Sequence, residues 1–172
     1  MNRPNLLTRK RPFSVARLQA SVRSMATTSP RIDIKADAPD LYRAYIHLDN
    51  TMGRSPLDPA LTLLVYLRAS YINGCAYCVE SHTRDALAAG ESDRRLYATA
   101  VWHESPLFSD RERAAFALTD AITEIAGHDV DAAYEAAAEH FHTDELAALI
   151  YAIVTINGWN RLAISTHMVF EG

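Results

Sequence analysis

The two cysteines of the chain, Cys75 and Cys78, lie in the segment NGCAYCVESHTRDA at positions 73–86, and His82 follows the second cysteine by four residues. A cysteine thiolate attacks peroxides and disulfides, and an imidazolium or a helix N-terminus nearby lowers the pKa of the thiol. Two intervening residues keep both sulfurs on one helical turn, so that an oxidised sulfur is resolved by its neighbour. The spacing therefore indicates a redox-active dithiol.

A helix that begins near Cys75 brings the chemically active side chains onto one face. At about 100° per residue, an arc of about 80° contains four of them: Cys75, Cys78, His82 and Asp85. Asp85 follows His82 by three residues, a spacing at which helical side chains meet. We expect His82 to take the proton of the attacking thiol and Asp85 to orient the imidazole ring.

Two other interpretations of the cysteine pair stay open. The two thiolates and His82 would bind zinc if a fourth ligand came from elsewhere in the chain. Two buried cysteines beside a hydrogen-bonded histidine would also be ordinary core residues. A single C-x2-C with a helical histidine lacks the second half of the usual metal-binding pattern, so we expect no metal and no other cofactor. The remaining histidines stand at no spacing that marks a fourth ligand; these are His47, His103, His128, His140, His142 and His167.

The elements that must position these residues are helices. From Ala36 onward, apolar residues recur at helical spacing between short breaks, and no segment alternates as a hairpin strand does. An all-α fold of about seven helices follows, and Gly158 inside the last segment disfavours one straight helix there. The predicted helices span 39–49, 61–72, 75–89, 92–104, 109–126, 129–141 and a final segment from residue 143.

Charge divides the chain into two parts. Residues 1–32 carry seven cations and no acid, whereas the other 140 residues carry all 21 acids and ten cations, a net charge of −11. An acidic domain repels phosphate backbones, so we expect no nucleic-acid partner. No apolar run approaches the length that spans a bilayer, so we expect no membrane partner. We therefore predict a basic, disordered extension over 1–31 and one domain over 32–172.

The extension has several interpretations. Residues 1–24 are rich in arginine and free of acids, which fits an organelle transit peptide or an interaction tail. Alternatively, Met25 is the real start, and residues 1–24 are upstream sequence or a disordered leader. Two cysteines and no apolar signal segment favour a reducing setting, and we expect a cytoplasmic protein.

The motifs resemble the AhpD-like alkylhydroperoxidases of the carboxymuconolactone decarboxylase superfamily. The resemblance covers Ile32 to Leu162 and rests on RASYINGCAYCVESHTRDALAAGESDRRLYATAVWHESPLFSDRERAAFALTDAITEIAG together with INGWNRLAI near the C-terminus. It implies an all-α fold, a homo-oligomer such as a trimer or hexamer, and reduction of organic hydroperoxides. It also implies a peroxide-attacking role for Cys78, a resolving role for Cys75 and a proton-relay role for His82. A retained C-x-x-C disfavours decarboxylation, because members known for that reaction do not rely on this pair.

One position departs from the family. The family has a glutamate twelve residues before the first cysteine, whereas this chain has Leu63 there. Loss of a positioned acid–base group weakens the proton relay, by on the order of 10²–10⁴-fold in rate. The favoured function is a thiol-dependent peroxidase or disulfide oxidoreductase, with a lipoyl or thioredoxin-like dithiol as reductant. The alternative is a non-catalytic helical scaffold or redox sensor with a degenerate site.

Several residues outside the dithiol helix face carry weaker expectations. Tyr77, between the cysteines, is a candidate supporting residue, and Arg68 either pairs with a core acid or raises the positive potential near the thiols. We expect Trp102 to be a core residue. The same structural role is expected for a polar-aromatic group late in the chain, which consists of Asn157, Trp159, Asn160 and Arg161. The 61–72 helix is apolar all round, so we expect it close to a subunit interface.

Overall fold

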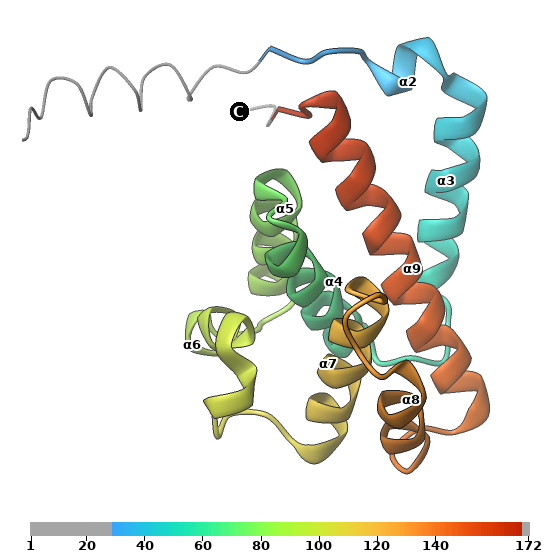
Figure 1. The fold of residues 1–172 in the computed structure, drawn as a ribbon. Helices are drawn as coiled ribbons and strands as arrows, with labels where there is room; N and C mark the ends of the chain where they lie inside the picture. The colour runs from blue at the N-terminus through green and yellow to red at the C-terminus, as the bar shows by residue number, and fades with distance from the viewer. Residues whose placement is uncertain (1–28, 170–172) are drawn as a thin grey trace, which may run out of the picture.

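The computed structural model describes residues 29–169, which fold as an all-α domain with no strand among them (Figure 1). The predicted fold class is confirmed, and every predicted helix has a counterpart. A short helix precedes them, and a 3-10 helix extends the fourth. The helices are α2 (Ile34–Asp37), α3 (Pro39–Met52), α4 (Pro59–Asn73), α5 (Ala76–Ala88), α6 (Asp93–Ala98), η1 (Thr99–Glu104), α7 (Asp110–Thr123), α8 (Val130–Ala138) and α9 (Thr143–Thr166).

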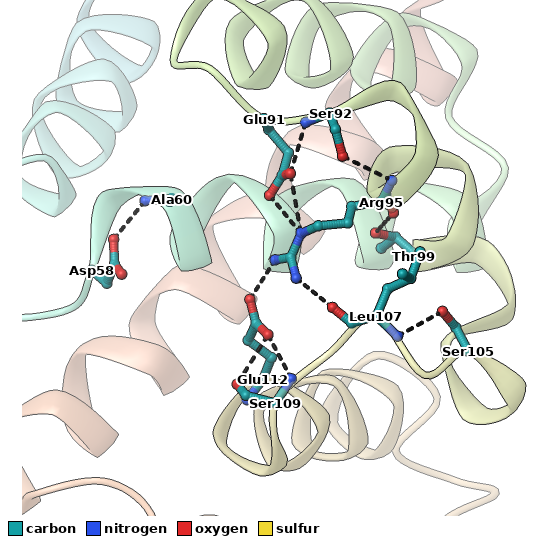
Figure 2. Close-up of polar contacts among 10 residues, drawn as sticks. All are labelled: Asp58, Ala60, Glu91, Ser92, Arg95, Thr99, Ser105, Leu107, Ser109 and Glu112. Carbon is teal, nitrogen blue, oxygen red and sulfur yellow. Dashed lines mark hydrogen bonds and ion pairs between the residues drawn. The ribbon is translucent and has the colours of Figure 1, made fainter.

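Local capping residues set the helix boundaries where the sequence predicts them. Ser109 and Glu112 form a capping box at the start of α7, and Ser92 accepts a hydrogen bond from the amide of Arg95 at the start of α6. Arg95 then joins the two helix starts, because its guanidinium contacts Glu91, Glu112 and the carbonyl of Leu107 (Figure 2). Helix α7 ends at Thr123, three residues before the predicted end at residue 126.

Helix α4 is the centre of the domain. It packs against α5, α7, α9 and η1, and its buried residues face in several directions. These neighbours belong to the same chain, so they already explain why α4 is apolar around its circumference. The apolar circumference of α4 therefore does not require a second subunit, and both the interface near α4 and the oligomer stay predictions.

Helix α9 runs without interruption for 24 residues, although Gly158 disfavours a single helix at this point of the sequence. Tyr45 of α3 packs on this glycine and donates a hydrogen bond to the carbonyl oxygen of Thr155 at 2.8 Å. The glycine therefore permits a close helix contact and does not end the helix. By length and composition alone α9 is also apolar enough to span a bilayer, contrary to the expectation for the sequence, but half of its most apolar window is buried inside the domain.

The predicted basic extension and the targeting interpretations lie outside the described residues, except for the last three positions of the extension. Of these, Arg31 is held by the end of α9. Its amide donates to the carbonyl of Thr166 at 2.8 Å, and its guanidinium donates to the carbonyl of Ser165 at 3.0 Å. The chain is thus attached to the helical domain from residue 31 onward.

Candidate active site

The turn between α4 and α5 places the dithiol. Gly74 ends α4 in the left-handed conformation with φ of 67°, which a residue with a Cβ rarely adopts. Cys75 is the N-cap of α5, and its sulfur accepts a hydrogen bond from the amide of Cys78 at 3.3 Å. The two cysteines form a disulfide, and both are buried. The predicted start of the helix near Cys75 is confirmed.

A buried amide network holds this turn against α9. The side-chain amide of Asn73 lies 3.0 Å from Oδ1 of Asn157 and 2.8 Å from Oδ1 of Asn160. Asn160 in turn donates to the hydroxyl of Ser70 at 3.0 Å. The expected structural role of the two α9 asparagines is confirmed, because they satisfy buried polar groups at the end of α4.

A cavity of about 250 Å³ opens in front of Cys78. Cys78, His82 and Asp85 line one wall, as their shared helical face predicts, and Tyr77 lines it too. Cys75 is not among the lining residues, so Cys78 is the sulfur that faces the cavity. The other walls come from α3, α9 and the segment after α9, through Tyr42, Ile46, Asp49, Trp159, Ala163 and Met168.

His82 lines the cavity together with Cys78 and two carboxylates, Asp49 and Asp85. Its ring meets the edge of the Tyr66 ring with centroids 5.0 Å apart, and its Nδ1 atom is buried without a hydrogen-bond partner among the described residues. Burial lowers the pKa of His82, while the charges of Asp85 and then Asp49 oppose that effect. A neutral imidazole with a free ring nitrogen is suited to accept a proton from a thiol.

Asp49 of α3 is a site residue that the sequence interpretation missed. Its Oδ1 accepts a hydrogen bond from the Tyr66 hydroxyl at 2.9 Å, and its Oδ2 accepts one from Trp159 Nε1 at 3.2 Å. Burial, and then the Asp49 charge, raise the pKa of Tyr66, so that this hydroxyl stays a donor. The helical stripe of α3 was the local signal available, and it does not distinguish Asp49 from an exposed acid.

Trp159 also differs from its expected role as a core residue. It is half-buried, lines the cavity, and packs edge-on against Tyr45 with centroids 4.8 Å apart. Its ring also meets that of Tyr42 at 5.8 Å. It is thus a wall of the site that several aromatic rings hold in place.

Two predicted residues lie elsewhere. Arg68 donates to both carboxylate oxygens of Asp120, at 2.6 and 2.9 Å, and to the carbonyl of Ala100. Of its two expected roles, pairing with a core acid is therefore confirmed, and a place beside the thiols is wrong. Leu63 packs with Ala86 and the end of α5 around a separate small cavity, and it does not line the dithiol cavity.

The donor set favours redox chemistry over metal binding. Both sulfurs are joined to each other, and within residues 29–169 no three His, Cys, Asp or Glu side chains gather as a metal site. A disulfide does not supply the thiolates that zinc needs. The arrangement is instead that of a dithiol–disulfide pair, with Cys78 and the His82 imidazole lining one cavity.

Comparisons with known proteins identify the family of this chain. A sequence model of the carboxymuconolactone decarboxylase family matches residues 39–121. The uncharacterized protein YdfG of Bacillus subtilis is 32% identical over 138 residues, which are 80% of this chain and 94% of YdfG.

Solved structures share the fold. A protein of unknown function from Agrobacterium tumefaciens, a candidate antioxidant defence protein AhpD, superposes with a TM-score of 0.81 and 34% identity over 84% of this chain and 99% of its own. An uncharacterized peroxidase-related protein from Ralstonia eutropha with an alkylhydroperoxidase AhpD core has a TM-score of 0.68 and 24% identity, over 89% and 83% of the two chains. This chain matches the family model, is similar to these relatives and has a C-x-x-C at the start of α5. It therefore belongs to the AhpD-like branch of the carboxymuconolactone decarboxylase superfamily.

Proposed function

We propose that this protein is a thiol-dependent peroxidase that reduces organic hydroperoxides through Cys78 and Cys75. The observation that carries the proposal is the Cys75–Cys78 disulfide at the start of α5, with Cys78 and His82 lining one cavity. The fold and family support a peroxidase-related function, and the geometry of the pair supports a dithiol cycle.

In the oxidative half of the cycle, His82 takes the proton of the Cys78 thiol. The thiolate attacks the terminal oxygen of the hydroperoxide, and the O–O bond breaks. The alcohol leaves with the proton from His82, and Cys78 becomes a sulfenic acid. The Cys75 thiol then attacks this sulfur, the disulfide forms, and water leaves.

In the reductive half, an external dithiol attacks the disulfide from the cavity, at Cys78. Cys75 is the leaving group, and its sulfur already accepts the Cys78 amide at the positive end of α5. A leaving thiolate stabilised in this way departs faster. The second thiol of the reductant releases Cys78, so that both cysteines return to thiols and the reductant becomes a disulfide.

The partners of the cycle are proposals as well. The reductant is a dithiol of the lipoyl or thioredoxin-like class, since a single thiol would leave a mixed disulfide on Cys78. We also propose a homo-oligomer, a trimer or hexamer, which light scattering at micromolar concentration tests. A monomer of about 19 kDa, the mass of one chain, would contradict that assembly.

The test of the function follows alcohol production and thiol oxidation together. Reduced protein is desalted, mixed with cumene hydroperoxide and examined by chromatography and mass spectrometry. We expect each chain to produce one alcohol molecule and to gain one internal disulfide. When dithiothreitol is present, each chain should produce many alcohol molecules. A single turnover that dithiothreitol does not extend would support the redox-sensor alternative. Wild-type protein that leaves the hydroperoxide intact would refute both functions.

A further inference from the structure

We infer that Asp49 is the positioning residue of the dithiol site: its carboxylate fixes Tyr66 and the Trp159 wall, and together with Asp85 it supplies negative charge that stabilises His82 when His82 holds the proton of Cys78. This inference rests on the proposed function for its catalytic meaning. The hydrogen bonds of Asp49 to Tyr66 and Trp159 do not depend on that function.

The first support is the hydrogen bonding of Asp49. Each carboxylate oxygen accepts a different donor, Tyr66 from α4 and Trp159 from α9, at 2.9 and 3.2 Å. A carboxylate that joins three helices has one orientation, so its charge stays at a fixed point on the cavity wall. Tyr66 then transmits this order to His82, whose ring it meets edge-on.

The second support is the charge around His82. The titratable groups that face it are Cys78 and Asp85 from α5, Asp49 from α3 and the neutral Tyr66 from α4. None of these is a cation, so an imidazolium in this cavity is stabilised only by carboxylates. The charge of Asp85 raises the pKa of His82 more than that of Asp49 does, but Asp85 is about half exposed, and its Oδ1 lies 4.0 Å from Nε of Arg84. Asp49 makes no ion pair among residues 29–169, and its charge therefore acts on the cavity itself.

The experiment compares carboxylate variants on one helix. Asp49→Asn removes the charge and keeps the shape, Asp49→Glu keeps the charge and changes the reach, and Asp40→Asn is the matched control. Asp40 is a solvent-exposed carboxylate on the same helix, paired with Arg43. Two quantities are measured: the NMR pKa of His82 in the disulfide form, assigned with His82→Gln, and the rate constant of the reduced protein with cumene hydroperoxide at pH 7.

We expect Asp49→Asn to lower the pKa of His82 and to slow the reaction by about tenfold or more. Asp49→Glu should leave the pKa of His82 close to the wild-type value and recover part of the rate. Asp40→Asn should match wild type in both measurements. A merely structural role would make both Asp49 variants equally slow and leave the pKa of His82 unmoved, and that result would overturn the inference.

A wild-type measurement covers the case in which the Asp49 variants do not fold. Coupling between two titrating groups is reciprocal, so the carboxyl carbon of Asp49 should show a step in its chemical shift at the pKa of His82. The step should vanish in His82→Gln, and its absence from wild type would refute the inference. The NMR measurements use the disulfide form, so they decide this inference even if no hydroperoxide is consumed.

Discussion

Two carboxylates on opposite sides of α4 have the same kind of partner and different surroundings. Asp120 accepts a hydrogen bond from Trp102 Nε1 at 3.1 Å, and Asp49 accepts one from Trp159 Nε1 at 3.2 Å. Asp120 is also bound through both oxygens by Arg68, and its side chain is only 8% exposed. Asp49 has a tyrosine hydroxyl in place of the guanidinium and faces a cavity.

The difference separates a structural carboxylate from one available to chemistry. The guanidinium neutralises Asp120, so this buried pair fixes α4 against α7 and has no charge left to act on a substrate. Neutral donors hold Asp49 in place without cancelling its charge. A similar hydrogen-bond pattern therefore serves packing on one side of α4 and holds a charged group at the dithiol cavity on the other.

The largest expected effect is the loss of hydroperoxide consumption when the reacting sulfur of Cys78 is removed. Cys78→Ser should lower hydroperoxide consumption by at least about 10³-fold, since a serine hydroxyl is not ionised at neutral pH. Cys75→Ser is the control, because it should still reduce one hydroperoxide and stop at a sulfenic acid that dimedone traps. Dimedone labelling and alcohol production are measured together. The assigned roles are wrong if Cys78→Ser still consumes hydroperoxide and Cys75→Ser does not.

The next largest effect is a loss of stability when the carboxylate of Asp120 is removed on the opposite side of α4. Asp120→Ala leaves the Arg68 charge buried without a partner, and we expect it to lower the free energy of unfolding by about 3–5 kcal/mol. Urea unfolding measures the change. The double variant Arg68→Met with Asp120→Leu should recover most of the loss, because two apolar groups replace the pair. If Asp120→Ala is as stable as wild type, Asp120 is not a structural carboxylate.

A third change, at Gly158, disturbs the packing behind the Trp159 wall of the dithiol cavity. A Cβ at Gly158 would lie 1.8 Å from the hydroxyl oxygen of Tyr45, so Gly158→Ala forces Tyr45 away from α9 and disturbs its packing on Trp159. We expect a loss of about 1–3 kcal/mol in the free energy of unfolding. The control is Gly127→Ala, whose Cβ would meet its nearest atom at 3.6 Å. Equal stability of the two variants would contradict the close contact.

The charge of a hydroperoxide should affect its rate of reaction in this cavity. The cavity is lined by Asp49 and Asp85 and by no lysine or arginine. We expect cumene hydroperoxide with a para-carboxylate to react about tenfold more slowly than the uncharged compound at low salt. Asp85→Asn and added salt should each narrow the gap in stopped-flow measurements. Equal rates for the two compounds would mean that the cavity carboxylates do not act on the substrate.

The smallest effect concerns pH. Burial lowers the pKa of His82 below its ordinary value of 6.5, so the folded chain holds this proton less readily than the unfolded chain. The contribution to stability is fully present above pH 6.5 and is lost as the pH falls through 6.5 to the lower folded value. Urea unfolding across this range should show a smaller loss for His82→Gln than for wild type. The same pH dependence in both chains would contradict a depressed pKa.

The sequence predicts the parts of this site that lie close together along the chain. The face shared by Cys78, His82 and Asp85 follows from the spacing of residues within one helix, and Gly74 and the capping residues set where that helix starts. Asp49 has no such signal, because Tyr66 and Trp159 are 17 and 110 residues away from it. Such a contact depends on helix packing, which residue spacing does not specify.

The same limit explains why the sequence leaves two roles open for Arg68 of α4. At about 100° per residue, Arg68 lies about 200° around the helix from Tyr66. Tyr66 therefore faces His82 on α5, while Arg68 faces Asp120 on α7. The apolar pattern identifies α4 as buried on all sides, and it leaves open which side meets the dithiol.

The contact between Arg31 and the end of α9 has a practical consequence. It brings the first described residues beside Met168, which lines both the dithiol cavity and a wider hollow of about 830 Å³ next to it. Helix α8 lies at the opposite end of the domain (Figure 1). A fusion partner, affinity tag or solid support attached near either end of the described chain would lie beside this hollow, where we expect it to hinder bulky reductants. A label placed on α8 would leave that approach open.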